Sequence, residues 1–384
     1  MPPGIAPFRV DVTDATLDDL RRRLAATRFT DQIPAVGWDY GTDLDYLRDL
    51  VTYWHDSYDW RATEERLNRY EHYTTTIDGQ NIHFLHAPSP VPDALPLVLT
   101  HGWPGSIIEF LDVIEPLRDP ARHGGDTADA FHVVCPSLPG YAFSGPTRER
   151  GWHPGRVAAA WAELMARLGY TQYAAQGGDW GSFVTTQLAL ADPEHLAGIH
   201  LTMAVPNPGT DDPATFTDDE RDAIAGFTLM MGDEGGYYRI QSTRPQTLGY
   251  ALEDSPAGLC AWIVEKFRAW SDCDGEIERS FTRDQLLDNV MLYWVTATAN
   301  SSTRLYFEFD QALRSGQLNV GTRVEVPTGY ARYPKEIMKT SRRWAERDYN
   351  LMHFADLPRG GHFATMEEPE LFVDDLRACF RARR

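Results

Sequence analysis

The stretch QGGDWGS, residues 176–182, joins a short apolar run to a sequence with helical periodicity. Gly177 and Gly181 stand two positions before and after Asp179, which is the spacing of a nucleophile elbow. Small residues are needed there because the turn from strand to helix is sharp and larger side chains would clash. An aspartate that only caps a helix after a Gly-Gly turn would have the same local sequence. The surrounding sequence must therefore decide between a nucleophile elbow and a simple helix cap.

Short apolar runs alternate with helical patterns on both sides of this turn. The runs, each of strand length, are LPLVLT (95–100), FHVVC (131–135), QYAAQ (172–176), LAGIHLT (196–202), RVEVPTG (323–329) and LMHFADL (351–357). Helical patterns occupy residues 155–169, residues 183–192 and the end of the chain from Glu368. This alternation predicts a mostly parallel sheet with helices on both faces, and together with the elbow it predicts an α/β-hydrolase fold.

Two further segments are rich in helical patterns. We interpret residues 1–90 as a helical extension that ends in a β-hairpin, because Asp78-Gly79 lies between two β-rich runs. Residues 206–320 have few strand candidates and separate two parts of the core, residues 91–205 and 321–384. We interpret them as a helical cap, because open α/β sheets bind ligands at the carboxyl ends of their strands, where this insertion emerges. The alternative is a second domain without a role in catalysis.

The composition limits the partners and the location of the protein. A net charge of −20 is spread along the 384 residues, which excludes the basic face that nucleic-acid binding requires. The four cysteines form no CxxC pair and are typical of reduced thiols. No apolar stretch approaches the roughly 20 residues that span a bilayer, and the N-terminus lacks a signal-peptide pattern. We expect a soluble cytoplasmic protein without a membrane anchor; its oligomeric state, a homodimer included, stays open.

A carboxylate at the elbow changes the expected reaction. Serine at this position attacks acyl carbons, whereas Asp179 is suited to displacement at a saturated carbon, which forms an alkyl ester of the protein. Water must then attack the ester carbonyl, and this step needs a general base and an oxyanion hole around the aspartate. Epoxides and alkyl halides are the natural substrates of such a scheme, which requires neither a metal nor an organic cofactor.

The motif HGWPGS, residues 101–106, follows the run at 95–100, where α/β hydrolases place one half of the oxyanion hole. We therefore expect backbone N–H donors at Trp103 and at Trp180, the residue after the nucleophile. Pro104 would fix the turn, and a cis Trp103–Pro104 bond is one way to do so. Taken alone, the motif is also compatible with a tight structural turn, and its place upstream of the elbow favours the functional interpretation.

The base and its partner are expected near the C-terminus, because the chain order in this fold is nucleophile, acid, histidine. His362 lies in a glycine-flanked loop after the last predicted strand and before the closing helix. The acid should follow the preceding strand, where Glu336 stands 26 residues before the histidine. Asp348 and Asp356 are alternatives to Glu336. For each of the three acids, the non-catalytic interpretation is that it forms a surface salt bridge.

Four motifs together resemble the microsomal-type epoxide hydrolases: HGWPGS, GGDWGS, VPTGYARYPKEI (326–337) and RGGHFATMEEPEL (359–371). The resemblance covers nearly the whole chain and includes that family's N-terminal domain. It implies that Asp179 is the nucleophile, His362 the base that activates water, and Glu336 the acid that orients the base. The anchor helix of membrane-bound relatives is missing from the N-terminus, so the chain is similar to a soluble bacterial member.

The resemblance also implies two tyrosines that hydrogen-bond the epoxide oxygen. GGYYRIQSTRP (235–245) matches one site at Tyr237, and SSTRLYFE (301–308) matches the other at Tyr306. A protonated phenol can donate to the oxygen while the C–O bond breaks. Tyr238 directly follows Tyr237 and is an alternative to it. For each of the three tyrosines, the non-catalytic interpretation is that it packs in an aromatic core.

The expected activity is therefore hydrolysis of an epoxide to a vicinal diol. The aromatic residues of the cap suggest a bulky, apolar or aryl-substituted substrate, in natural-product biosynthesis or in detoxification. A haloalkane dehalogenase uses the same kind of nucleophile but needs halide-binding N–H donors in place of the two phenols. The other alternative is a non-catalytic small-molecule binder on the same fold, which could lose members of the triad freely.

Overall fold

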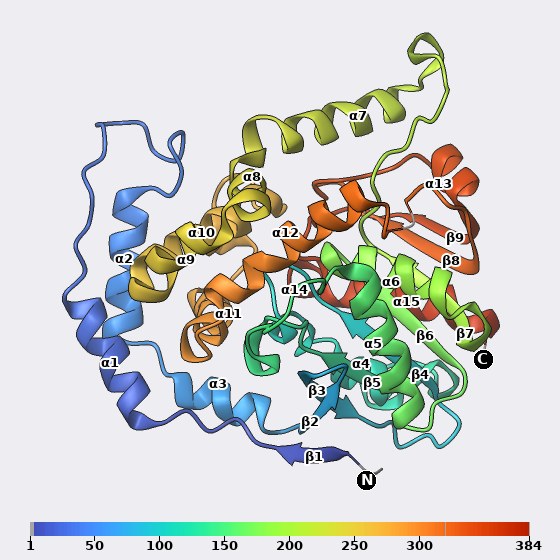
Figure 1. Cartoon of the computed structure of the whole chain (residues 1–384), viewed down its shortest axis with the longest axis horizontal. Coiled ribbons are helices and arrows are strands. Elements are labelled where there is room, and N and C mark those ends of the chain that lie inside the picture. Colours follow the sequence, from blue (N-terminus) through green and yellow to red (C-terminus); the bar gives the residue numbers. More distant parts are fainter. Residues whose placement is uncertain (1–3, 319, 384) are drawn as a thin grey trace.

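The computed structural model describes residues 4–318 and 320–383. Within them, one sheet has the strand order β1-β2-β3-β5-β4-β6-β7-β8-β9 (Figure 1). Its parallel part consists of β5 (Phe131–Pro136), β4 (Leu95–Thr100), β6 (Tyr173–Gly177), β7 (Leu196–Leu201), β8 (Val324–Arg332) and β9 (Tyr349–Asp356). Each of the six apolar runs forms one of these strands. Strands inside the sheet read as apolar runs because they are covered on both faces, whereas β9 is an edge strand without a fully buried residue. The predicted α/β-hydrolase fold with a mostly parallel sheet is confirmed.

Helices follow the parallel strands as the alternation predicts. The helices of the core are α4 (Ile114–Arg118), α5 (Pro154–Arg167), α6 (Trp180–Ala191), α13 (Arg342–Asp348), α14 (Ala364–Glu367) and α15 (Pro369–Phe380). The helix after the elbow, α6, packs against β4, β6, β7 and β8, and α5 packs against α6. The first turn of α6 therefore begins in the middle of the sheet, at the carboxyl end of β6.

The first ninety residues contain β1 (Ile5–Phe8), α1 (Asp14–Ala25), α2 (Leu44–Asp56), α3 (Trp60–Leu67), β2 (Glu71–Ile77) and β3 (Gln80–Ala87). The expected hairpin forms, and Asp78 and Gly79 have φ angles of 49° and 75°, as a tight two-residue turn requires. Its strands continue the main sheet, since β3 pairs with β5. The short strand β1 was not expected; Pro7 is tolerated there because β1 is the edge strand.

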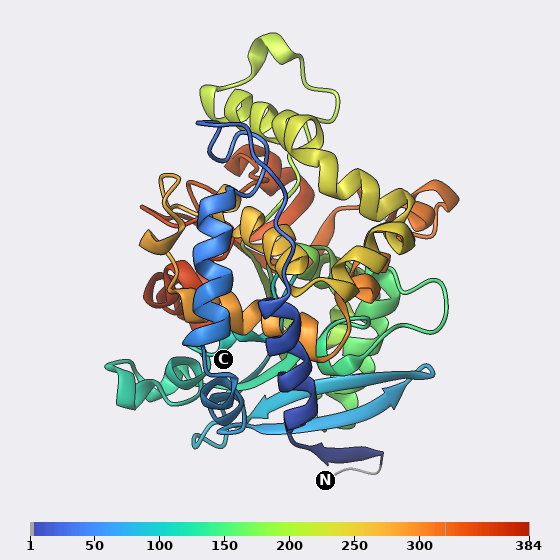
Figure 2. The same cartoon turned by 90° about the vertical axis from the view of Figure 1, so that its left-hand side faces the viewer.

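Six helices between β7 and β8 lie over the carboxyl edge of the sheet (Figure 1). They are α7 (Asp218–Met231), α8 (Gly236–Thr243), α9 (Pro245–Asp254), α10 (Pro256–Trp270), α11 (Arg283–Val295) and α12 (Ala299–Ser315). Figure 2 shows α1 and α2 running alongside these helices. Polar contacts join the two groups: Tyr53 donates to Asp284 and Tyr58 to Asp288, each at 2.8 Å. The division into extension, core and cap stays a prediction.

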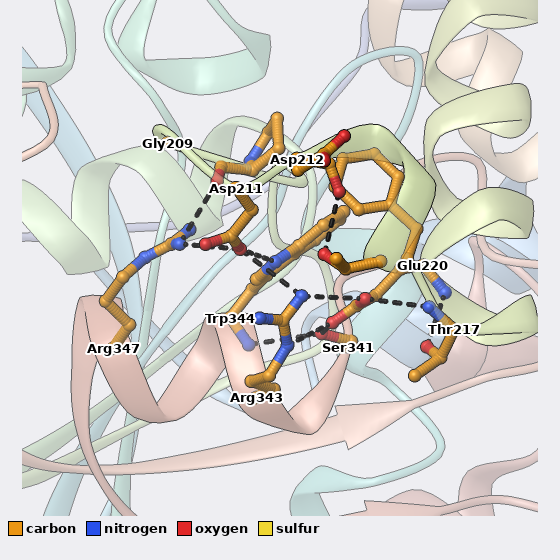
Figure 3. A network of polar contacts seen from close by, with 12 residues as sticks. Gly209, Asp211, Asp212, Thr217, Glu220, Ser341, Arg343, Trp344 and Arg347 are labelled. Carbon is orange, nitrogen blue, oxygen red and sulfur yellow. Dashed lines mark hydrogen bonds and ion pairs between the residues drawn. The ribbon is translucent and has the colours of Figure 1, made fainter.

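The segment that leads from β7 into α7 is tied to α13 by the polar network of Figure 3. Arg343 on α13 lies between Glu220 and Asp211, with Nε 2.7 Å from Glu220 Oε1 and Nη2 3.3 Å from Asp211 Oδ2. Glu220 also closes a capping box with Thr217 at the start of α7. The ion pair with Arg343 lowers the pKa of Glu220 to about 2, so the carboxylate stays ionised at neutral pH. Among the described residues, no helix has the length and apolar character that crossing a membrane requires.

Candidate active site

The elbow between β6 and α6 has space only for glycines. A Cβ atom at Gly177 would lie 2.1 Å from the carbonyl oxygen of Gly181, and one at Gly181 would lie 2.0 Å from the carbonyl oxygen of Thr100. Asp179, at the apex, has φ 48° and ψ −127°, a backbone conformation that costs energy for a non-glycine residue. This strained turn holds one carboxylate above the sheet, at the N-terminus of α6, where the helix dipole favours negative charge.

The HGWPGS loop meets this carboxylate directly. The backbone N–H of Trp103 donates to Asp179 Oδ1 at 2.8 Å. Gly102 makes the approach possible, because a Cβ atom there would lie 2.1 Å from the same oxygen. The Trp103–Pro104 peptide bond is cis. Trp180 follows the aspartate as the first residue of α6, so both residues expected to donate to an oxyanion adjoin Asp179.

His362 lies between two carboxylates. Its Nδ1 is 2.8 Å from Glu336 Oε1 and its Nε2 is 3.6 Å from Asp179 Oδ2. The histidine loop is held in place by α10, since the backbone N–H of His362 donates to the carbonyl of Trp270 at 2.9 Å. The structure therefore brings the three residues of the expected triad together, with the histidine between the two carboxylates, although they lie far apart in the chain.

The two alternative acids lie elsewhere. Asp348 accepts hydrogen bonds from Asn207 at 3.1 and 3.3 Å, and Asp356 forms an exposed ion pair with Arg332. Neither contacts His362. The side chain of Glu336, by contrast, is 1% exposed, so its pairing with the imidazole is shielded from solvent.

Charge at the triad is set by burial and by the two carboxylates. Burial disfavours the imidazolium, but Glu336 and then Asp179 outweigh burial and raise the pKa of His362 well above its ordinary value. The two adjacent carboxylates thus favour the imidazolium over the neutral ring. Any reaction that removes the charge of Asp179 or Glu336 therefore lowers the pKa of His362.

Both tyrosines that the resemblance implied face the elbow from the cap. Tyr237 on α8 stacks on Trp103 with ring centroids 5.1 Å apart, and Tyr306 on α12 meets the ring of Trp180 edge-on at 4.7 Å. Burial, reinforced by the charge of Asp179, raises the pKa of both phenols well above the usual value, so they stay protonated. The hydroxyl of Tyr306 has no hydrogen-bond partner among the described residues.

Tyr238 has a different role. Its hydroxyl donates to Asp310 Oδ1 at 2.7 Å, and this bond holds α8 to α12. The hydroxyl of Tyr238 is therefore already engaged by a carboxylate, whereas no carboxylate among the described residues accepts a hydrogen bond from the hydroxyl of Tyr306.

A cavity of about 610 Å³ connects these groups with the surface. Asp179, Tyr237 and Tyr306 stand at its inner end, and the exposed side chains of Met231 and Val320 stand at its mouth. The wall is mostly apolar, with aromatic and aliphatic side chains from the elbow helix, the segment after β7, the cap and the start of β9: Trp180, Phe183, Met203, Phe227, Met230, Phe309, Leu313 and Tyr349. Such a cavity suits an apolar molecule whose reactive end reaches the carboxylate.

The sequence did not reveal two residues that hold the HGWPGS loop. Asn289 and Tyr293, on α11, bond the loop backbone: Asn289 Nδ2 donates to the carbonyl of Pro104 at 2.7 Å, and the Tyr293 hydroxyl donates to the carbonyl of Gly105 at 2.5 Å. Their spacing of four residues puts both on one face of the helix. That spacing is common in any packed helix, so only the fold shows what the face contacts.

Comparison with known proteins agrees with the fold and with the motifs. Residues 5–110 match the family described as "Epoxide hydrolase N terminus", and residues 96–234 match "alpha/beta hydrolase fold". A "Putative epoxide hydrolase" of Stigmatella aurantiaca (strain DW4/3-1) is 48% identical over 99% of this chain and 86% of that protein. "Epoxide hydrolase 1" of Sus scrofa is 38% identical over 97% of this chain and 88% of that protein.

Among solved structures, the epoxide hydrolase of Aspergillus niger superposes with a TM-score of 0.87 at 32% identity, over 100% of this chain and 97% of that one. The relatives and this structure agree along the whole length, from the N-terminal extension to the last helix. The chain belongs to the microsomal-type epoxide hydrolase family, and it is an epoxide hydrolase that converts an epoxide and water to a diol.

Proposed function

We propose that the reaction proceeds through a covalent ester on Asp179. An oxygen of the carboxylate attacks one carbon of the epoxide, the C–O bond of that carbon breaks, and the ring oxygen leaves as an alkoxide. Tyr237 and Tyr306 donate hydrogen bonds to that oxygen while it gains charge. The observation that carries the proposal is that one carboxylate, at the end of an apolar cavity, faces two buried phenols and a histidine at 3.6 Å.

The second step is hydrolysis of the ester. His362 takes a proton from a water molecule, whose oxygen attacks Cγ of Asp179, and Glu336 stabilises the imidazolium that forms. The carbonyl oxygen of the ester becomes an oxyanion next to the backbone N–H groups of Trp103 and Trp180. Collapse of this intermediate breaks the bond to the alcohol, which takes the proton from the imidazolium and leaves as the diol. The second proton of the attacking water, now on the carboxyl group of Asp179, passes to His362 and restores the starting carboxylate.

The cavity supports a bulky, apolar or aryl-substituted epoxide as substrate. Burial of apolar surface supplies the binding energy, and the carboxylate and phenols suited to the epoxide stand at the inner end, while Asn207 and Asp348 add polar groups elsewhere on the wall. A product of secondary metabolism and a foreign aromatic compound share this chemistry, so either a biosynthetic or a detoxifying role is compatible with the site.

A single turnover in oxygen-18 water tests the ester route. With enzyme in excess over styrene oxide, the first diol should carry an unlabelled oxygen from Asp179, and the label should appear in the protein. Solvent oxygen in the first-turnover diol would mean direct attack by water. Asp179→Asn should form no adduct, and a parallel incubation with a haloalkane should release no halide; halide release would favour a dehalogenase instead.

A further inference from the structure

A second, much smaller cavity of about 20 Å³ lies at Asp179 beside the large one. Its wall includes His362, which does not line the large cavity, while Asp179 lines both. The nucleophile thus stands between the space that fits a substrate and a separate polar space beside the histidine. A cavity needs only about 10–15 Å³ of such volume to hold one water molecule.

Unpaired polar atoms point to a ligand in the small cavity. Gln176 and Thr365, both on its wall, are 2% and 5% exposed. Among the described residues, Gln176 Oε1 and Thr365 Oγ1 have no hydrogen-bond partner. Buried polar atoms without a partner cost free energy, and a water molecule that contacts two to four such groups removes this cost.

Glu109 adds a carboxyl group to the same wall. It packs against the backbone of Gly105, where a Cβ atom would lie 1.4 Å from Glu109 Oε1, so a side chain at 105 would displace the carboxyl. Burial raises the pKa of Glu109 to about 8; the nearby imidazolium of His362 opposes this rise and the charge of Asp179 adds to it. At neutral pH the carboxyl is therefore protonated, so it can both donate and accept a hydrogen bond.

We propose that the small cavity holds the water molecule that hydrolyses the alkyl-enzyme, and that Glu109 is a positioning residue that orients this water toward Asp179 and His362. The inference rests on the ester route proposed above. One proton of the water goes to His362 Nε2 while its oxygen bonds to Cγ of Asp179, and Glu109 accepts the other O–H as a hydrogen bond. Glu109 keeps its own proton throughout, and the water reaches the ester without crossing the substrate cavity.

The test separates the two half-reactions by rapid quenching and mass spectrometry of the intact protein. Glu109→Gln and Glu109→Met have similar length, but only the glutamine keeps a donor and an acceptor. We expect Glu109→Met to slow ester hydrolysis about tenfold or more, with alkylation within about threefold of wild type, so that adduct accumulates. Glu109→Gln should restore hydrolysis to within about threefold. Glu115→Gln, a partly exposed carboxyl in the same segment, serves as the matched control.

The outcomes distinguish this proposal from the ester route itself. If wild type forms adduct and Glu109→Met hydrolyses it at the wild-type rate, or loses both steps equally, the role of Glu109 is refuted and the route stands. If the wild-type enzyme forms no adduct, the ester route itself is refuted. Should Glu109→Met not fold, Thr365→Val decides, because it removes one hydroxyl of the same wall with little change in volume; an unchanged hydrolysis rate there overturns the water site.

Discussion

Replacing Glu336 with glutamine removes one negative charge from the triad and keeps a similar shape. The amide oxygen can still accept from His362 Nδ1, so the ring should keep its orientation. Under the proposed route, the substitution removes the charge that stabilises the imidazolium formed when the histidine takes a proton from water. Because the nucleophilic attack of Asp179 does not protonate the histidine, the change should act on ester hydrolysis and spare alkylation.

The expected size follows from the geometry. At 2.8 Å between Nδ1 and Oε1, and with an effective dielectric constant of about 20, the charge–charge attraction is about 6 kcal/mol, which is an upper bound. The lower bound is the difference between a charge-assisted and a neutral hydrogen bond, about 1–2 kcal/mol. Between these limits we expect ester hydrolysis to slow by about 10²–10³-fold.

The assay follows covalent adduct after mixing enzyme with excess styrene oxide. Glu336→Gln should accumulate nearly one equivalent of adduct in the first turnover, at close to the wild-type rate, and then release diol slowly. Asp356→Asn is the matched control, because it removes an exposed carboxylate at the end of β9 that pairs with Arg332 and does not contact the histidine. It should behave as wild type.

Two results would refute this reasoning. If hydrolysis in Glu336→Gln stays within threefold of wild type, the acid does not support the base. If alkylation and hydrolysis slow by the same factor, the substitution has disturbed the site as a whole, and the separation of the two steps is wrong.

Three further predictions follow from the geometry. Tyr237→Phe and Tyr306→Phe should each slow alkylation about 10–100-fold, as expected for a lost hydrogen bond to developing charge, whereas Tyr238→Phe should leave it within about threefold; stopped-flow tryptophan fluorescence measures the step. Gly181→Ala should lower the free energy of unfolding by about 3 kcal/mol in urea titrations, because its Cβ would meet a backbone oxygen at 2.0 Å. Glu220→Gln should lower the urea midpoint at pH 7. Since the folded-state pKa of Glu220 is depressed to about 2, this difference should persist above its unfolded pKa of about 4.3 and vanish as the pH falls through 2.

The sequence predicted the parallel strands well because their signal is local. Each buried strand reads as an apolar run, and the elbow needs glycines at fixed positions, so both leave a trace within a few residues. The order of β6, the elbow and α6 then placed Asp179 without any knowledge of distant contacts. The edge strand β1 left no such trace, since four residues with a proline carry too little pattern to recognise.

The surroundings of the site could not be predicted in the same way. Glu109 is one acidic residue among many, and its distinction comes from what surrounds it: a glycine whose missing side chain makes room, and a histidine that is more than 250 positions away in the chain. Asn289 and Tyr293 likewise bond the HGWPGS loop from α11, which is more than 180 positions away in the chain. Such contacts depend on the packing of separate elements, and packing leaves little periodicity in the sequence.

Under the proposed route, an aspartate at the elbow also sets the order of the two chemical steps. In the free enzyme two carboxylates raise the pKa of His362 well above its ordinary value, so the protonated ring is favoured, and a protonated ring is not a base. Esterification of Asp179 removes one of the two charges, so the pKa falls and the ring can release that proton. That proton can pass to the alkoxide after the C–O bond has broken, so the protons balance without exchange with solvent and the rate of ring opening does not depend on this transfer. Under the proposed route the histidine thus becomes a base only after the ester exists, which protects the epoxide from premature attack by activated water.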